Sequence, residues 1–257
     1  MQLQSVPTRI RVFWQPGCTS CLRTKEFLTA HGVDYESINV QDDVQGMEVL
    51  RRLGARSVPV VALGERFVYA QSLADVIKFL GLNLRLNERL PPEELARRIG
   101  IVLRAALRYV AQIPTEKLDV DVRNRKRSSR VLAHHVFRIV EAFLEAAAGA
   151  TLTYESTVMP PGTDIETQAD IAQYGAAVLA RFEGWWASCP DKSCTAMVDT
   201  YYGSHAMHEV LERTAWHSAQ HTRQLTMLLE MLGIDPNGPL TPADLAGLPL
   251  PEKVWDD

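Results

Sequence analysis

Two pairs of side chains in the sequence have types and spacings that suit chemistry. Cys18 and Cys21 enclose two residues, and His217 and His221 enclose three. Cysteines at the first spacing can close an intramolecular disulfide or supply two thiolates to a zinc ion. Histidines four positions apart lie on one side of a helix, where both imidazoles can bind one divalent metal ion. The sequence therefore predicts sulfur chemistry at the first pair and metal chemistry at the second.

The cysteine pair needs a strand and a helix to position it. Residues 9–13 have the composition of a short strand, and residues 19–31 can form a helix. Cys18 then lies at the helix N-terminus, where free N–H groups and the helix dipole favour its thiolate. Further along the chain, Val58 and Pro59 start another predicted strand. A cis proline there would turn the backbone of Val58 toward the sulfurs and expose it to an extended substrate.

Other interpretations of the cysteines remain open. Cys18 and Cys21 could be unrelated thiols or half of a zinc site, although Cys189 and Cys194 do not repeat their spacing. Cys189 and Cys194 could form a regulatory disulfide across a loop or remain free thiols.

The strand, the C-x-x-C pair on the turn into a helix, and the later Val-Pro together resemble the glutaredoxin and thioredoxin-like superfamily over about residues 8–82. By this resemblance Cys18 is the catalytic nucleophile, Cys21 resolves the mixed disulfide and Pro59 is the cis-proline. The resemblance also implies that residues near these positions bind the substrate: Gln15, Val58, Gln71 and Ser72.

The sequence departs from glutaredoxins where these commonly bind glutathione. Gln15 stands where a lysine is common, and Tyr69-Ala70-Gln71-Ser72 replaces a glycine pair followed by an acidic residue. We therefore expect another small thiol, or the partner domain, as the client of this site.

The two halves of the chain differ in pattern and predict two domains. The first alternates predicted strands and helices, which requires a mixed sheet with helices packed on it, as in an α/β thioredoxin-like fold. The second carries four amphipathic stripes at steps of three and four, which predict an all-α four-helix bundle. The expected strands and helices of the first half are 9–13, 19–31, 35–40, 44–53, 58–63, 66–70 and 73–80. The expected divisions are a redox domain at 1–83, a linker at 84–92, the bundle at 93–235 and an extended C-terminal tail at 236–257.

The histidine pair falls on the apolar stripe of the last bundle helix, so both rings should point inward. Burying two imidazoles costs several kcal/mol unless their nitrogens find partners. A divalent metal is one solution; hydrogen bonds to carbonyls and carboxylates are the alternative. His135 is the expected third ligand because it shares the stripe of the second helix. Its neighbour His134 is expected on a solvated surface, and His208 lies about opposite His217 on its helix.

One histidine on the second helix and an H-x-x-x-H pair on the fourth are similar to the DinB-like family of metal-binding bundles. That family includes mycothiol-dependent maleylpyruvate isomerases and bacillithiol transferases. The resemblance covers about residues 90–235 and implies that His135, His217 and His221 bind the metal. The expected cofactors are a low-molecular-weight thiol and a divalent metal, zinc first, with nickel and manganese as alternatives.

A basic cluster precedes the second bundle helix. It is either an anion site for a carboxylate-bearing thiol or substrate, or a solvated loop. Its members are Arg123, Arg125, Lys126, Arg127 and Arg130.

Composition narrows the class of protein. The 257 residues are 46% hydrophobic and 23% charged, with a net charge of -4, which gives no general attraction to nucleic acid or anionic membranes. No apolar run reaches the ~20 residues that span a bilayer, and the N-terminus lacks the apolar stretch of a secretory signal. We expect a cytoplasmic protein with neither nucleic-acid nor membrane partners, and leave open a homodimer through the bundle.

Three functions are consistent with these patterns. The first is a thiol-dependent enzyme in which a metal-activated small thiol reacts with a disulfide or electrophilic substrate, as an S-transferase or isomerase, while the C-x-x-C domain exchanges disulfides. The second is a plain protein disulfide reductase with a non-catalytic helical docking domain. The third is a redox or metal sensor.

Overall fold

The computed structural model describes residues 9–256. The first eight residues, where no secretory signal is expected, and the last residue lie outside this range. The chain divides into two compact units. One extends to Asn87 and includes the segment from Pro251 onward, and the other comprises Glu88–Leu250.

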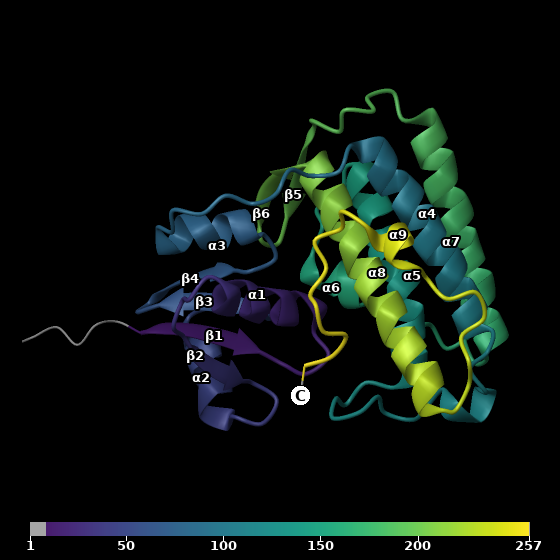
Figure 1. Cartoon of the computed structure of the whole chain (residues 1–257), viewed down its shortest axis with the longest axis horizontal. Coiled ribbons are helices and arrows are strands. Elements are labelled where there is room, and N and C mark those ends of the chain that lie inside the picture. Colours follow the sequence, from purple (N-terminus) through teal and green to yellow (C-terminus); the bar gives the residue numbers. More distant parts are fainter. Residues whose placement is uncertain (1–8, 257) are drawn as a thin grey trace, which may run out of the picture. The chain divides into compact units, whose positions relative to one another are not determined.

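The first unit is a four-stranded mixed sheet with three helices (Figure 1). The strand order is β2-β1-β3-β4, in which β1 is parallel to β2 and antiparallel to β3, and β3 is antiparallel to β4. This confirms the order of elements expected from the sequence and the thioredoxin-like character of the unit. Its elements are β1 (Ile10–Trp14), α1 (Thr19–Ala30), β2 (Glu36–Asn39), α2 (Val44–Arg52), β3 (Val60–Leu63), β4 (Arg66–Tyr69) and α3 (Leu73–Leu80).

Alternation along β1 gives the sheet a core on each face. Successive side chains of a strand point to opposite faces. Phe13 accordingly packs in a cluster with Ile38 and Val60, whereas Val12 packs in another with Leu28. All of these side chains are at most 7% exposed, so both faces of the sheet are covered.

The second unit is helical, as expected. Its four long helices are α4 (Pro92–Val110), α5 (Ser129–Ala147), α7 (Gln168–Ser188) and α8 (Met207–Met231). Both α7 and α8 pack against α4 and α5. Close approach of α5 and α7 depends on Gly175, because a Cβ there would lie 2.6 Å from the Phe137 ring.

Short elements join these helices, and several were not expected from the sequence. They are the 3-10 turn η1 (Thr115–Lys117), the helix α6 (Tyr154–Val158), and the hairpin of β5 (Met197–Thr200) and β6 (Gly203–Ala206). Strands of four residues offer too few positions for a periodic pattern to stand out.

The segment after α8 is not uniformly extended as expected. It contains one turn of helix, α9 (Pro242–Leu245), because Thr241 and Asp244 form a reciprocal capping box and Pro242 occupies the first helical position. Across residues 9–256, no helix combines the length and apolarity needed to cross a bilayer.

Candidate redox site and histidine cluster

Cys18 and Cys21 form a disulfide at the start of α1, with their Cα atoms 5.2 Å apart. Cys18 is the N-cap residue, and its Sγ accepts a hydrogen bond from the backbone N–H of Cys21 at 3.2 Å. Such a donor, together with the helix dipole, favours negative charge on the Cys18 sulfur once the disulfide is reduced. Cys21 is fully buried, whereas Cys18 is only half-buried, so an external sulfur reaches Cys18 first.

The segment that leads into β3 packs in the same cluster as the disulfide. The Val58–Pro59 peptide bond is cis, as the resemblance to glutaredoxins implied. Val58 is 8% exposed and belongs to the same buried cluster as Trp14 and Cys21, against which Cys18 and Tyr69 pack. Val58 is thus brought into the surroundings of the disulfide.

Three other residues predicted to bind substrate have roles within the unit. Gln15 is half-buried, and its carbonyl accepts from the backbone N–H of Cys18 at 3.3 Å. Gln71 is buried, and its side-chain oxygen accepts from the Ser20 hydroxyl at 2.8 Å. Ser72 caps α3 by accepting from the N–H of Asp75. The Gln15 and Gln71 bonds hold residues on either side of Cys18, whereas the Ser72 bond belongs to α3.

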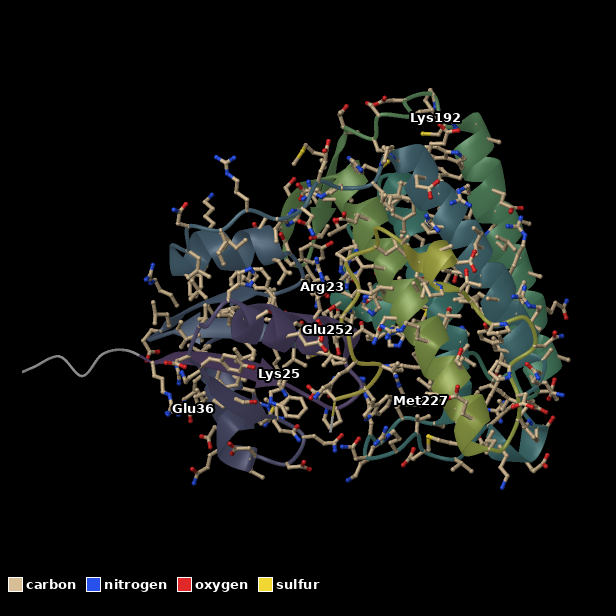
Figure 2. The ribbon with its side chains drawn as sticks, viewed as in Figure 1. Arg23, Lys25, Glu36, Lys192, Met227 and Glu252 are labelled. Atoms are coloured by element: carbon tan, nitrogen blue, oxygen red, sulfur yellow. A yellow bond between two sulfur atoms is a disulfide. The ribbon has the colours of Figure 1, made fainter. Side chains whose placement is uncertain are left out.

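Sequence analysis did not anticipate that the C-terminal segment packs beside this disulfide. The Trp255 ring covers Gly17, the residue before Cys18, and is 5% exposed. Lys25 pairs with Asp256 at 2.9 Å, and its ammonium lies 3.5 Å from the centroid of the Trp14 ring. Figure 2 labels Lys25 on α1 and Glu252 on this segment. The only signal in the sequence is a tryptophan in a short tail, which gives no indication of its contact.

Comparisons with known proteins agree with this geometry. The glutaredoxin family profile matches residues 10–68. An uncharacterized glutaredoxin-like 8.6 kDa protein in the rubredoxin operon of Clostridium pasteurianum is 31% identical over 72 residues, which are 28% of this chain and 96% of that protein. The chain belongs to the glutaredoxin family.

Two further relatives are similar to this chain over shorter spans. Glutaredoxin-like protein NrdH of Escherichia coli is 37% identical over 57 residues, 22% of this chain and 70% of that protein. Gene 56 protein of Mycobacterium phage L5 is 40% identical over 53 residues, 20% of this chain and 52% of that protein. The first unit is therefore a glutaredoxin-like thiol–disulfide oxidoreductase domain with its two cysteines at disulfide distance.

The second unit brings the three predicted histidine ligands together. His135 projects from α5, and His217 and His221 project from α8. One potential ligand nitrogen from each ring lies within 4.8 Å of the corresponding nitrogens of the other two rings. The ring centroid of His135 lies 5.8 Å from the ring centroid of His217 and 4.8 Å from that of His221. The packing of α5 against α8 creates this cluster from positions far apart in the sequence.

The cluster is held neutral and one of its rings is oriented. Burial first, and then the charges of nearby arginines and the neighbouring imidazoles, lower the pKa of each of the three histidines well below its usual range. Neutral imidazoles keep the lone pairs that a metal needs. The Nδ1 of His221 lies 2.7 Å from Oε1 of Gln224, which favours a proton on Nδ1 and leaves Nε2 as the ligand atom. Nδ1 of His217 is buried with no hydrogen-bond partner among the described residues.

The expected solvated surface around His134 is wrong. His134 is 4% exposed, and its ring stacks on Tyr174 of α7 with centroids 4.6 Å apart. Burial is the main reason that the pKa of His134 falls to about 4. Helix α7 covers this face of α5, and an analysis of one helix at a time does not include that neighbour.

The remaining histidines of α8 and the hairpin have other partners. Nδ1 of His205 lies 2.9 Å from a carboxylate oxygen of Glu209, and Nε2 of His208 lies 2.8 Å from the carbonyl of Leu90. Neither belongs to the three-histidine cluster.

The alternatives left open for the two cysteines and the basic cluster of this unit can now be compared with the structure. Cys189 and Cys194 are free thiols, and burial raises the pKa of Cys194 to about 11. Within the basic cluster, Arg130 pairs with Asp119 at 3.0 Å, whereas Arg125 and Arg127 are half-buried and form no ion pair with a described carboxylate.

Proposed function

We propose that this chain couples a C-x-x-C thiol–disulfide oxidoreductase to a three-histidine metal site that activates a low-molecular-weight thiol. The observation that carries the metal half is the convergence of His135, His217 and His221 in neutral form. In this proposal the helical unit is a DinB-like bundle, supported by one histidine on α5, the second long helix, and two on α8, the fourth.

In the redox domain, the thiolate of Cys18 attacks one sulfur of a substrate disulfide. The S–S bond breaks, one half leaves as a thiolate and the other stays on Cys18 as a mixed disulfide. The Cys21 thiolate then attacks the Cys18 sulfur, releases the second thiolate and closes the Cys18–Cys21 disulfide. Two electrons pass to the substrate, and a small dithiol or two monothiols restore the reduced cysteines. The half exposure of Cys18 and the burial of Cys21 support this division of roles.

In the helical unit, the three imidazoles fit a divalent cation. Nitrogen ligands without a carboxylate suit zinc or nickel better than magnesium or calcium, and three protein ligands leave room for an exogenous one. A bound metal would lower the pKa of a coordinated thiol and so supply a thiolate at neutral pH. Gln224 would hold His221 in the ligand tautomer, and Nδ1 of His217 would find the partner that it lacks among the described residues.

A plain disulfide reductase is the competing function, because the family match rests on the redox domain. Elemental analysis of full-length protein purified without chelators or affinity metals separates the two. We expect close to one equivalent of a divalent metal in the wild type and in His31→Ala, an exposed histidine outside the cluster, and a large loss in His217→Ala.

Function is then assayed with the same variants. His217→Ala should retain disulfide reduction and lose thiol transfer to an electrophile, whereas Cys18→Ser should lose disulfide reduction and retain the metal. Metal-free wild-type protein, or equal thiol transfer by the wild type and His217→Ala, would refute the metal half and leave the reductase.

A further inference from the structure

Two half-buried arginines of the loop before α5 have no counter-charge among the described residues. Within residues 9–256, neither Arg125 nor Arg127 forms an ion pair with a carboxylate, and Nε of Arg127 is buried without a hydrogen-bond partner. Burial lowers the pKa of Arg125 to about 10 and, together with the charge of Arg125, lowers that of Arg127 further from its usual range. Arginine stays protonated at neutral pH, so two positive charges are left partly desolvated.

Hydrogen bonds through Gln224 connect Arg127 to the histidine cluster. Nη2 of Arg127 donates to Oε1 of Gln224 at 3.3 Å, and the same oxygen lies 2.7 Å from Nδ1 of His221. The charges of Arg125 and Arg127 also contribute, after burial, to the low pKa of His135. The Arg127 guanidinium therefore shares the Gln224 oxygen with the His221 ring, and the charge of Arg125 acts on His135.

Partly desolvated guanidinium groups beside a three-histidine cluster are unfavourable unless an anion joins them. Removing a charge from water is costly unless a partner and hydrogen bonds compensate it. A divalent ion on the histidines would add to the positive charge. The arginine fork matches a planar carboxylate with two parallel N–H···O bonds.

We propose that Arg125 and Arg127 form a subsite for the carboxylate of a small-molecule ligand whose other end faces the histidine cluster. This inference deepens the proposed function, because it assigns the activated thiol to the class of carboxylate-bearing thiols. The carboxylate would fix the orientation of the thiol and direct its sulfur toward the position left open by the three imidazoles.

The first test needs no metal. Full-length apoprotein is titrated with propionate and with propionamide, its neutral counterpart, at constant ionic strength, and binding is followed by amide chemical shifts. Since charge-assisted hydrogen bonds contribute more than neutral ones, we expect propionate to bind about tenfold more tightly than propionamide. Arg125→Gln and Arg127→Gln should each remove this preference, whereas Lys126→Gln, an exposed cation of the same loop, should keep it. If Arg127→Gln unfolds, the affinities of Arg125→Gln and of the wild type for propionate and propionamide still test the proposal. Equal affinity for the two probes, or a preference that survives both arginine changes, overturns the proposal.

The second test adds Co²⁺ and separates this inference from the metal proposal. In a Cys18→Ser, Cys21→Ser background, 3-mercaptopropionate should perturb the Co²⁺ absorption at lower concentration than 2-mercaptoethanol. Arg127→Gln should abolish the difference while Co²⁺ still binds. Absence of Co²⁺ binding would refute the metal site, and the propionate titration alone would then decide the arginine subsite.

Discussion

The packing of Trp255 on Gly17 predicts that a single methyl group will release the C-terminal segment from the redox domain. A Cβ at Gly17 would lie 2.5, 2.8 and 2.9 Å from three atoms of the Trp255 ring. Separations this short do not occur between real side chains, so Gly17→Ala must displace the ring. Gly32, at the other end of α1, has a similar φ of +65° and nothing within 4 Å of its Cβ position, which makes Gly32→Ala the matched control.

The two changes share one penalty and differ in another. Each places a Cβ on a left-handed residue, which costs about 1–2 kcal/mol, whether or not the tail is docked. Gly17→Ala also gives up the burial of Trp255, worth about 2–3 kcal/mol for a large apolar side chain. Only this second amount changes the equilibrium between the docked and the released tail. It corresponds to about a 30- to 140-fold change in that equilibrium.

Native-state hydrogen exchange measures this equilibrium directly. The backbone N–H groups of Glu252 and Lys253 donate to the Glu26 carboxylate at 2.6 and 3.0 Å, so they exchange when the tail is released. Both amides should exchange about 30- to 140-fold faster in Gly17→Ala and at the wild-type rate in Gly32→Ala. In a Trp255→Ala background, Gly17→Ala should have no further effect on these amides. Unchanged exchange in Gly17→Ala, or equal acceleration in both glycine variants, would contradict the contact.

Two further predictions concern the helical unit. Because burial raises the pKa of Cys194 to about 11, only about a thousandth of this thiol is ionised at pH 8. Iodoacetamide should therefore label Cys194 far more slowly than the half-buried Cys189, and peptide mass spectrometry can measure both rates. Comparable labelling rates would show that Cys194 is accessible and contradict this prediction. Burial raises the pKa of Glu141, but hydrogen bonds, including one from Tyr174 at 2.6 Å, outweigh burial and hold it below the ordinary 4.5. This stabilisation is therefore complete above pH 4.5 and is lost as the pH falls through the lowered value. Glu141→Gln should lower the thermal unfolding midpoint at neutral pH and flatten its decline in acid, and an unchanged acid profile would refute this role.

Several features of the redox domain could be predicted from local sequence. The span of α3 follows from Ser72, which caps its start, and from Gly81, which ends it in a left-handed conformation with φ +65°. Cys18 falls at a helix N-terminus because a strand and a helix meet there. Each of these signals acts within one or two turns of the chain, so the residues themselves carry it.

Other features depended on which elements pack together. The solvated surface predicted for His134 was wrong because α7 covers it. The sequence did not decide whether Arg125 and Arg127 belong to an anion site or to a solvated loop, and the structure shows them half-buried. The position of Trp255 on Gly17 likewise follows from a contact between the two ends of the chain.

The sequence by itself determined the two cysteines at a helix start, the order of elements around them and the spacing that puts His217 and His221 on one side of a helix. Only the tertiary structure brings His135, the expected third ligand, within reach of that pair and links Arg127 to His221 through Gln224. The physical reason is the range of the interactions: caps and periodicity act between near neighbours, whereas burial and desolvation are set by surfaces contributed by residues far away in the chain.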